Sequence, residues 1–148
     1  EIDTLKFTDK SINVQKDIIG VFNLIKSEDD ISSKIYRLYN AAFSRFPDKS
    51  GLQYWIDKNV SGENTYKQTA NSFLISKEFT NSYGFKSSNS EYITNLYSNV
   101  LDRKPDADGF EYWSTQIEKG LEDRSDLLMG FSESHENKSI FLNETNII

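Results

Sequence analysis

The stretch LDRKPDADGFEYW, residues 101–113, has the residue types of a cation-binding loop, because three aspartates and a glycine come just before two aromatic residues. An EF-hand calcium loop needs oxygen ligands at positions one, three and five and a bidentate glutamate at position twelve. With Asp106 and Asp108 at positions three and five, position one is a lysine and position twelve is a threonine. We therefore expect no metal or other cofactor, and calcium at Asp106 and Asp108 is the weaker alternative.

The same pattern occurs earlier in the chain, as FSRFPDKSGLQYW at residues 43–55. In this copy Ser50 stands in place of Asp108, whereas the proline, the first aspartate and the glycine are the same. A proline disfavours helical geometry in the residue before it, and an aspartate after it can accept hydrogen bonds from the free amides of a new helix. The shared residues therefore predict a turn in which Asp48 and Asp106 are helix N-caps.

Each loop leads into two adjacent aromatic residues, Tyr54-Trp55 and Tyr112-Trp113. Neighbouring residues on a helix point about 100° apart, so one ring of each pair can face the core while the other lies at its edge. We expect each tryptophan to pack and each tyrosine to be the exposed member. A half-exposed ring can stack on a sugar or contact a partner protein, so all four residues are candidate ligand-binding residues.

Two arginines, Arg45 and Arg103, precede the two loops. Near the C-terminal end of a helix, an arginine can bond the last carbonyl groups, interact with the helix dipole or pair with a carboxylate. The functional alternative is contact with an anion or a sugar acid, so both are also candidate ligand-binding residues. Their occurrence in both copies favours the structural role, because a scaffold residue must recur whereas a site residue need not.

The residue inventory argues against several classes of protein. His135 is the only histidine and cysteine is missing, so nucleophilic catalysis would depend on one side chain in a polar run. The acidic residues could supply a glycosidase pair, but their spacing singles out no two of them. A net charge of −6 disfavours nucleic-acid binding, and no apolar run approaches the ~20 residues that a membrane helix needs. We expect a protein that is not an enzyme, binds no nucleic acid and does not insert into a membrane.

Helices must position these residues, and the chain contains two matching sets. Residues 35–79 align with 93–137 without a gap. In each copy, apolar residues at i, i+3 and i+4 predict a first helix. The capping aspartate begins a second helix, which ends at a glycine suited to a left-handed cap, Gly62 or Gly120. A third helix carries a phenylalanine that both copies share.

We predict an all-α fold in which two tandem three-helix repeats, at about 31–79 and 90–137, pack into a single helical domain of residues 17–148. An apolar stripe predicts an extra N-terminal helix ahead of the repeats: Ile18, Ile19, Phe22 and Ile25. Residues 1–16 alternate as two short strands of a β-hairpin, and we expect them to be the edge of an upstream module. The last ten residues are expected to be a short extended segment or a frayed end.

The stretches LYSNVLDRKPDADGFEYW and GFSESHEN resemble the family called domain of unknown function 4214, whose members read G-R-x-P-D-x-x-G-x-x-Y-W and then G-F-x-x-S-x-E-F. The second copy carries this match at these positions: Arg103, Pro105, Asp106, Gly109, Tyr112, Trp113, Gly130, Phe131, Ser132, Ser134 and Glu136. Two tandem copies would cover most of the chain from about residue 31. Ser44 and Asp102 stand where the family usually has glycine, and Asn137 stands where it has phenylalanine.

The resemblance implies an all-helical fold, no known catalytic residue, and a large, modular, exported bacterial parent such as a calcium-repeat adhesin, a toxin or an S-layer protein. The pattern is also similar, more faintly, to the helical linker repeats of phycobilisomes, whose role is protein assembly. We expect a secreted or cell-surface, non-catalytic binding or assembly module. Its partner would be a cell-surface glycan, a protein or the upstream module of the same chain. The alternatives are a carbohydrate-binding module that uses exposed aromatics and an accessory domain of a secreted hydrolase.

Overall fold

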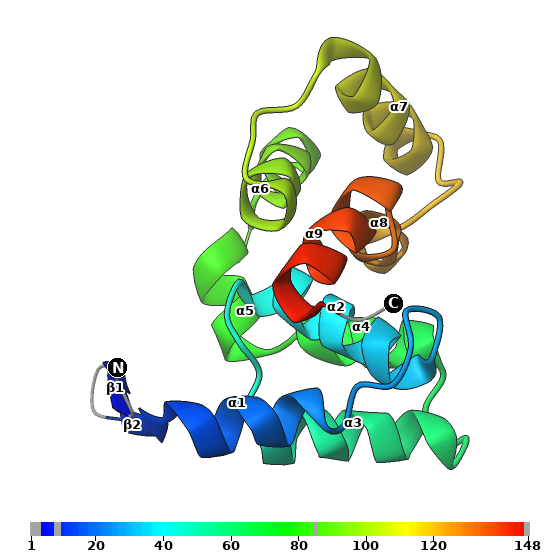
Figure 1. Cartoon of the computed structure of the whole chain (residues 1–148). Coiled ribbons are helices and arrows are strands. Elements are labelled where there is room, and N and C mark those ends of the chain that lie inside the picture. Colours follow the sequence, from blue (N-terminus) through cyan, green and yellow to red (C-terminus); the bar gives the residue numbers. More distant parts are fainter. Residues whose placement is uncertain (1–3, 8–9, 85, 147–148) are drawn as a thin grey trace.

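The computed structural model describes residues 4–7, 10–84 and 86–146. Helices make up most of this part of the chain (Figure 1), so the predicted all-helical domain is confirmed. The helices are α1 (Val14–Phe22), α2 (Ile31–Phe43), α3 (Lys49–Val60), α4 (Tyr66–Leu74), α5 (Lys77–Tyr83), α6 (Asn89–Leu101), α7 (Ala107–Glu118), α8 (Arg124–Ser132) and α9 (His135–Thr145). None of the helices in these residues combines the length and apolar composition that crossing a membrane requires.

Two four-residue strands, β1 (Thr4–Phe7) and β2 (Lys10–Asn13), pair antiparallel ahead of α1. Residues 1–3 and 8–9 of the predicted strand segment lie outside the described residues. α1 follows β2 directly and begins at Val14, while the predicted domain boundary at residue 16 stays a prediction. A pair of strands this short is only marginally stable in water, so the stable body of the protein is its helical part.

A polar side chain caps the start of each helix from α2 to α9 by accepting a hydrogen bond from a backbone N–H of the first turn. These caps are Asp30, Asp48, Thr65, Ser76, Ser88, Asp106, Asp123 and Ser134. The predicted caps Asp48 and Asp106 are thus confirmed, and each accepts from the glycine three residues on, at 2.9 and 3.0 Å. Gly62 and Gly120 have φ of 80° and 68°, the left-handed geometry expected after α3 and α7.

Each half of the helical part has four helices, and the prediction of three is wrong. The first half (residues 31–83) divides at Ser76 and the second half (residues 89–145) divides at Ser134. Each of these serines accepts a hydrogen bond from the backbone N–H three residues on, at 3.2 Å, and thereby begins α5 or α9. A serine whose side chain bonds the backbone can interrupt a helix without any change in the apolar pattern, so the sequence did not reveal the break.

The C-terminal segment is also helical, contrary to the extended or frayed tail that we expected. α9 runs to Thr145, while residues 147–148 lie outside the described part. Phe141 is buried and packs edge-on against Tyr36 of α2, with ring centroids 5.6 Å apart. This contact holds the last helix against the first half.

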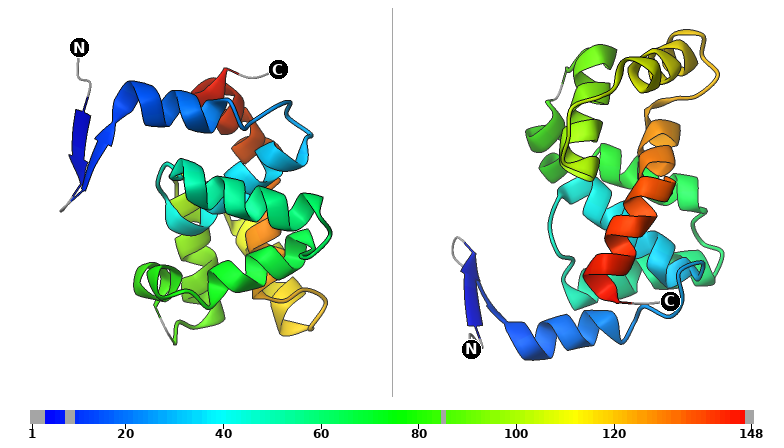
Figure 2. Two further views of the ribbon diagram at one scale, coloured as in Figure 1. Left: turned by 90° about the horizontal axis from the view of Figure 1, so that it is seen from below. Right: turned by 45° about the horizontal axis from the view of Figure 1, so that its top comes forward.

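α1 is the predicted extra N-terminal helix, but its inner face differs from the predicted stripe. Ile19 is 55% exposed, whereas Val21 is fully buried. Ile25, which is also buried, follows the end of the helix and reaches the core from the turn. α1 packs alongside α3, as the left view in Figure 2 shows.

The two halves correspond helix by helix. α6, α7 and α8 begin and end 58 residues after α2, α3 and α4, and α9 begins 58 residues after α5. In both halves the first helix contacts the other three. The halves pack together where α2 and α4 meet α8 and where α2 meets α6 and α9, and one hydrophobic core contains residues of both.

Among the described residues, no helix covers the second half as α1 covers the first, and the sequence explains why. In the first half α1 packs against Phe46 and shares a core cluster with Ile56. The corresponding residues of the second half are Lys104 and Ser114, which are polar. A polar surface at these positions needs no covering helix.

Candidate functional site

The two tyrosine–tryptophan pairs lie on α3 and α7 with closely similar geometry. Trp55 and Trp113 are partly buried, and each packs against a core phenylalanine of the next helix with ring centroids 5.1 Å apart. The tyrosines point outward: Tyr54 is 52% exposed and Tyr112 is 54% exposed. The predicted division, tryptophan inward and tyrosine outward, is therefore confirmed, whereas the role of these residues in ligand binding stays a prediction.

A glycine in α8 makes room for Trp113. A Cβ atom added to Gly130 would lie 2.8 Å from Cη2 of this indole, which is closer than atoms pack. The first half has Ser72 at the corresponding position. There the indole of Trp55 meets its phenylalanine at 90°, against 34° in the second half. The tryptophan ring therefore has a different tilt in the half with glycine at this position than in the half with serine.

The two pairs lie at opposite ends of the molecule and do not form one site. In Figure 1, α3 lies beside α1 at one end and α7 lies at the other end. Their surroundings also differ, because the Lys58 ammonium lies 5.2 Å from the centroid of the Tyr54 ring. Within the described residues, no cation lies over the ring of Tyr112.

The predicted site residues Arg45 and Arg103 are partly exposed and pair with glutamates of their own half. Arg45 donates two hydrogen bonds to Glu78, at 2.7 and 3.0 Å, and Arg103 donates two to Glu136, at 2.9 and 3.0 Å. These hydrogen bonds raise the pKa of both arginines above the ordinary value. Each guanidinium also lies over a tyrosine ring of its own half, 5.1 or 5.0 Å from the centroid. Both arginines therefore tie the loop after α2 or α6 to the first turn of α5 or α9.

The aspartates of the opening stretch also have structural roles. Asp102 is the C-cap of α6, and Asp108 lies in the first turn of α7. Asp106 caps α7 and also accepts a hydrogen bond from Arg103 at 3.2 Å. In the part of the chain that the structure describes, no group of three or more His, Cys, Asp or Glu side chains is placed to hold a metal ion.

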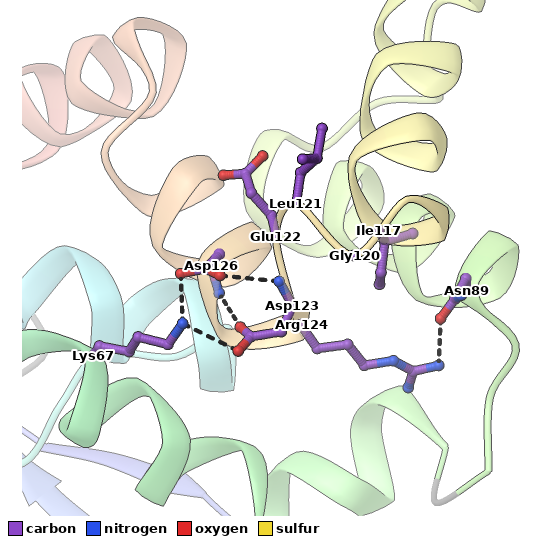
Figure 3. Close-up of a pocket in the computed structure, with 9 residues that line it drawn as sticks. All are labelled: Lys67, Asn89, Ile117, Gly120, Leu121, Glu122, Asp123, Arg124 and Asp126. Atoms are coloured by element: carbon purple, nitrogen blue, oxygen red, sulfur yellow. Dashed lines mark hydrogen bonds and ion pairs between the residues drawn. The ribbon is translucent and has the colours of Figure 1, made fainter.

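A cleft of about 530 Å³ lies where the halves meet, beside the start of α8 (Figure 3). Its volume falls within the roughly 300–1,000 Å³ that is common for ligand sites. The lining residues come from α4, α6, α7, the α7–α8 loop and α8: Lys67, Asn89, Ile117, Gly120, Leu121, Glu122, Asp123, Arg124 and Asp126. The sequence reasoning did not single out any of these as a site.

Ion pairs fix one side of the cleft. The ammonium of Lys67 lies 2.9 Å from a carboxylate oxygen of Asp126 and 3.0 Å from one of Asp123. Asp123 also accepts a hydrogen bond from the hydroxyl of Ser125 at 2.6 Å. This bond is the largest of the effects that lower the pKa of Asp123 far below its ordinary value, and Lys67 adds to it. The carboxylate of Asp123 is therefore charged at neutral pH, and Lys67 holds both carboxylates in place.

Arg124 forms the opposite side of the cleft. Its guanidinium donates to the backbone and side-chain oxygens of Ser87, at 2.6 and 3.2 Å, and to Asn89 at 3.2 Å. It also lies 4.8 Å from the centroid of the ring of Tyr92, a buried residue. In Figure 3 Arg124 reaches toward Asn89, away from the ion pairs of Lys67. The guanidinium thus has a fixed position and orientation.

Apart from Gly120, the cleft residues of the second half differ from their counterparts in the first half, which is why the sequence reasoning missed them. Arg124 corresponds to Tyr66, whose ring packs against the core of the first half, and Leu121 corresponds to Glu63. Our sequence reasoning concentrated on residues that both copies share. The sequence did contain a signal for the cleft, because most of its residues stand at corresponding positions where the two copies differ in chemistry.

Comparison with known proteins gives one match. Residues 70–141 match the family model described as Domain of unknown function (DUF4214). The match covers just under half of the chain, from α4 to α9. No curated protein and no solved structure matches the chain. The resemblance to DUF4214 seen in the sequence of the second half is thus supported, while two tandem copies and the likeness to phycobilisome linkers stay predictions.

Proposed function

We propose that this chain is a non-catalytic binding module of an exported or cell-surface bacterial protein. It would consist of two tandem copies of the DUF4214 unit and would contact its partner through Tyr54 and Tyr112. The observation that carries the proposal is recurrence without burial: both tyrosines occur at corresponding positions and both are more than half exposed.

Other residues that the copies share have a visible task in the fold. Leu38 and Leu96 are fully buried in the core. The shared arginines and glutamates pair with one another, and the shared aspartates cap helices. Each tyrosine ring contacts the neighbouring tryptophan edge-on but remains more than half exposed, and tyrosine is enriched at binding surfaces because its ring offers a large, rigid contact area. Recurrence of this ring is therefore better explained by binding than by folding.

The positions of the tyrosines favour a partner that the module contacts at both ends. α3 and α7 lie at opposite ends of one packed body (Figure 1), so a single small ligand cannot touch both rings. An extended or repeated partner, such as a protein of the cell surface, can contact both. Two linked contacts strengthen each other because the second forms at a high effective concentration.

Binding to isolated bacterial cell envelopes tests the proposal. The unaltered protein should co-sediment with envelopes, and Tyr54→Ser or Tyr112→Ser should each weaken the apparent affinity about tenfold or more, because avidity is lost. The control is Tyr66→Phe, since Tyr66 lies inside the first half. Equal binding by the unaltered protein and the double tyrosine variant would contradict the proposal.

The carbohydrate alternative is favoured by one observation, the uncovered ring of Tyr112. Envelopes treated with protease should lose binding if the partner is a protein and keep it if the partner is a glycan. Soluble polysaccharide should then quench tryptophan fluorescence only in the glycan case, because Tyr112 contacts Trp113 edge-on with ring centroids 5.0 Å apart.

A further inference from the structure

We propose that the cleft beside Arg124 is a second binding site, separate from the exposed tyrosines, and that its ligand is a neutral oligosaccharide. This inference does not rest on the role of Tyr54 and Tyr112. It follows from the cleft of about 530 Å³, the fixed polar groups around it and the apolar side chains on its wall.

The polar groups of the cleft are already held in place. Arg124 is oriented by the ring of Tyr92 and by the oxygens of Ser87 and Asn89. These three hydrogen bonds leave two of the five N–H donors of a guanidinium for a ligand. Lys67 is also held in place, because its ammonium group pairs with two carboxylates. Binding to groups that are already ordered costs little side-chain entropy.

The charge of the lining favours an uncharged ligand. Two cationic side chains, Lys67 and Arg124, face three anionic ones: Glu122, Asp123 and Asp126. The charges of Lys67 and the two aspartates pair with each other inside the protein. An anion would have to compete with these carboxylates and a cation with the ammonium and guanidinium. Hydroxyl groups, which both donate and accept, can bond the remaining donors and acceptors without breaking the ion pairs.

An apolar surface completes the site. Ile117 and Leu121 line the cleft, and the side chain of Leu121 is 65% exposed. In Figure 3 Ile117 lies on the α7 side of the cleft, across from Arg124. Sugar rings combine apolar C–H faces with hydroxyl groups, and sites for such ligands pair apolar walls with a few placed polar groups.

The first half supplies matched variants for the test, because it carries different residues at the same fold positions. Leu121→Glu and Arg124→Tyr each introduce the residue of the first half, Glu63 or Tyr66. Leu121 is largely exposed, so its replacement leaves the fold intact even if the change at Arg124 does not. Tyr112→Ser is the control that separates this site from the proposed function, because Tyr112 lies on α7, the helix of Ile117, but outside the cleft.

The experiment follows the methyl signals of Ile117 and Leu121 by NMR during titration with maltotriose, cellotriose and tri-N-acetylchitotriose, with trigalacturonate as the charged comparison. At least one neutral sugar should shift these signals saturably. In both cleft variants the affinity, measured from the methyl signal of Ile117, should fall at least tenfold. In Tyr112→Ser the affinity should stay unchanged. No saturable shift with any neutral sugar, shifts with trigalacturonate alone, or shifts that survive both cleft variants would overturn the inference. Loss of envelope binding in Tyr112→Ser with sugar binding intact would show that the two sites are independent.

Discussion

Arg37 on α2 and Glu133 at the end of α8 form a two-bonded ion pair that joins the two halves of the protein. Nε of Arg37 lies 2.7 Å and Nη2 lies 2.9 Å from the two carboxylate oxygens. The arginine side chain is 1% exposed and that of Glu133 is 21% exposed. The guanidinium also lies 4.7 Å from the centroid of the Phe141 ring. A charge taken out of water in this way depends on its partner.

Removing the acceptor should therefore destabilise the protein strongly. Glu133→Ala should lower the free energy of unfolding by about 3 kcal/mol, because it leaves the buried guanidinium of Arg37 without its counter-charge. Replacing both members with apolar residues, as in Arg37→Met with Glu133→Leu, should recover most of the loss. Urea unfolding monitored by circular dichroism measures both effects.

An exposed pair of the same chemistry is the control for this prediction. Arg45 and Glu78 are each 43% exposed in their side chains, so Glu78→Ala should cost less than about 1 kcal/mol. Similar losses for Glu133→Ala and Glu78→Ala would contradict the account of the buried pair.

Two of the left-handed helix ends offer sites for stabilisation. Ser44 and Asp102 end α2 and α6 with φ of 51° and 53°, the conformation that glycine adopts without steric cost. The resemblance to DUF4214 places glycine at these positions, and the structure supplies the reason. Ser44→Gly and Asp102→Gly should each raise the free energy of unfolding by about 0.5–1 kcal/mol. Ser61→Gly is the opposite control, since Ser61 ends α3 with φ of −74° and gains nothing from glycine.

Acid should destabilise the protein through its aspartate caps. The hydroxyl of Ser32 lowers the pKa of Asp30, and the backbone N–H of Gly109 lowers that of Asp106. A carboxylate with a lowered pKa in the folded state binds fewer protons than in the unfolded state, so its contribution is complete above the ordinary value of about 3.9 and is lost as the pH falls through the folded value. Melting temperature should be nearly constant from about pH 7 to 5 and should then fall towards pH 2.

Asp106→Asn tests whether the aspartate caps cause this loss of stability at low pH. Asparagine caps a helix about as well as aspartate but carries no titrating carboxyl group, so the variant should lose less stability on acidification than the unaltered protein. A melting temperature that rises between pH 5 and pH 3, or an acid slope that is steeper in the variant, would refute the assignment.

The sequence predicted those parts of the fold that local chemistry determines. The caps Asp48 and Asp106 and the left-handed glycines Gly62 and Gly120 lie within a few residues of the groups they bond, so their spacing is visible in the chain. The inward turn of the tryptophans followed from helical geometry. Serine caps such as Ser76 were missed because serine also occurs inside helices, and its place in the sequence does not show whether its side chain bonds the backbone.

Contacts between the halves could not be predicted from one sequence. Arg37 and Glu133 are 96 residues apart, and the corresponding residues, Asn95 and Ile75, cannot form such a pair. Ile75 is instead 84% exposed. The cleft beside Arg124 depends on the same packing, because its walls come from both halves. Such features depend on the packing of α2 and α4 against α8. The residues that the two copies share do not predict this packing.

The most direct test of the binding proposal compares stability with binding in one variant, Tyr54→Ser with Tyr112→Ser. Serine and tyrosine have similar helix propensities, so the free energy of unfolding should stay within about 0.5 kcal/mol of the unaltered protein while envelope binding is lost. A loss of about 2 kcal/mol or more, as for a core aromatic residue, or unchanged binding, would contradict the claim that these tyrosines recur in order to bind.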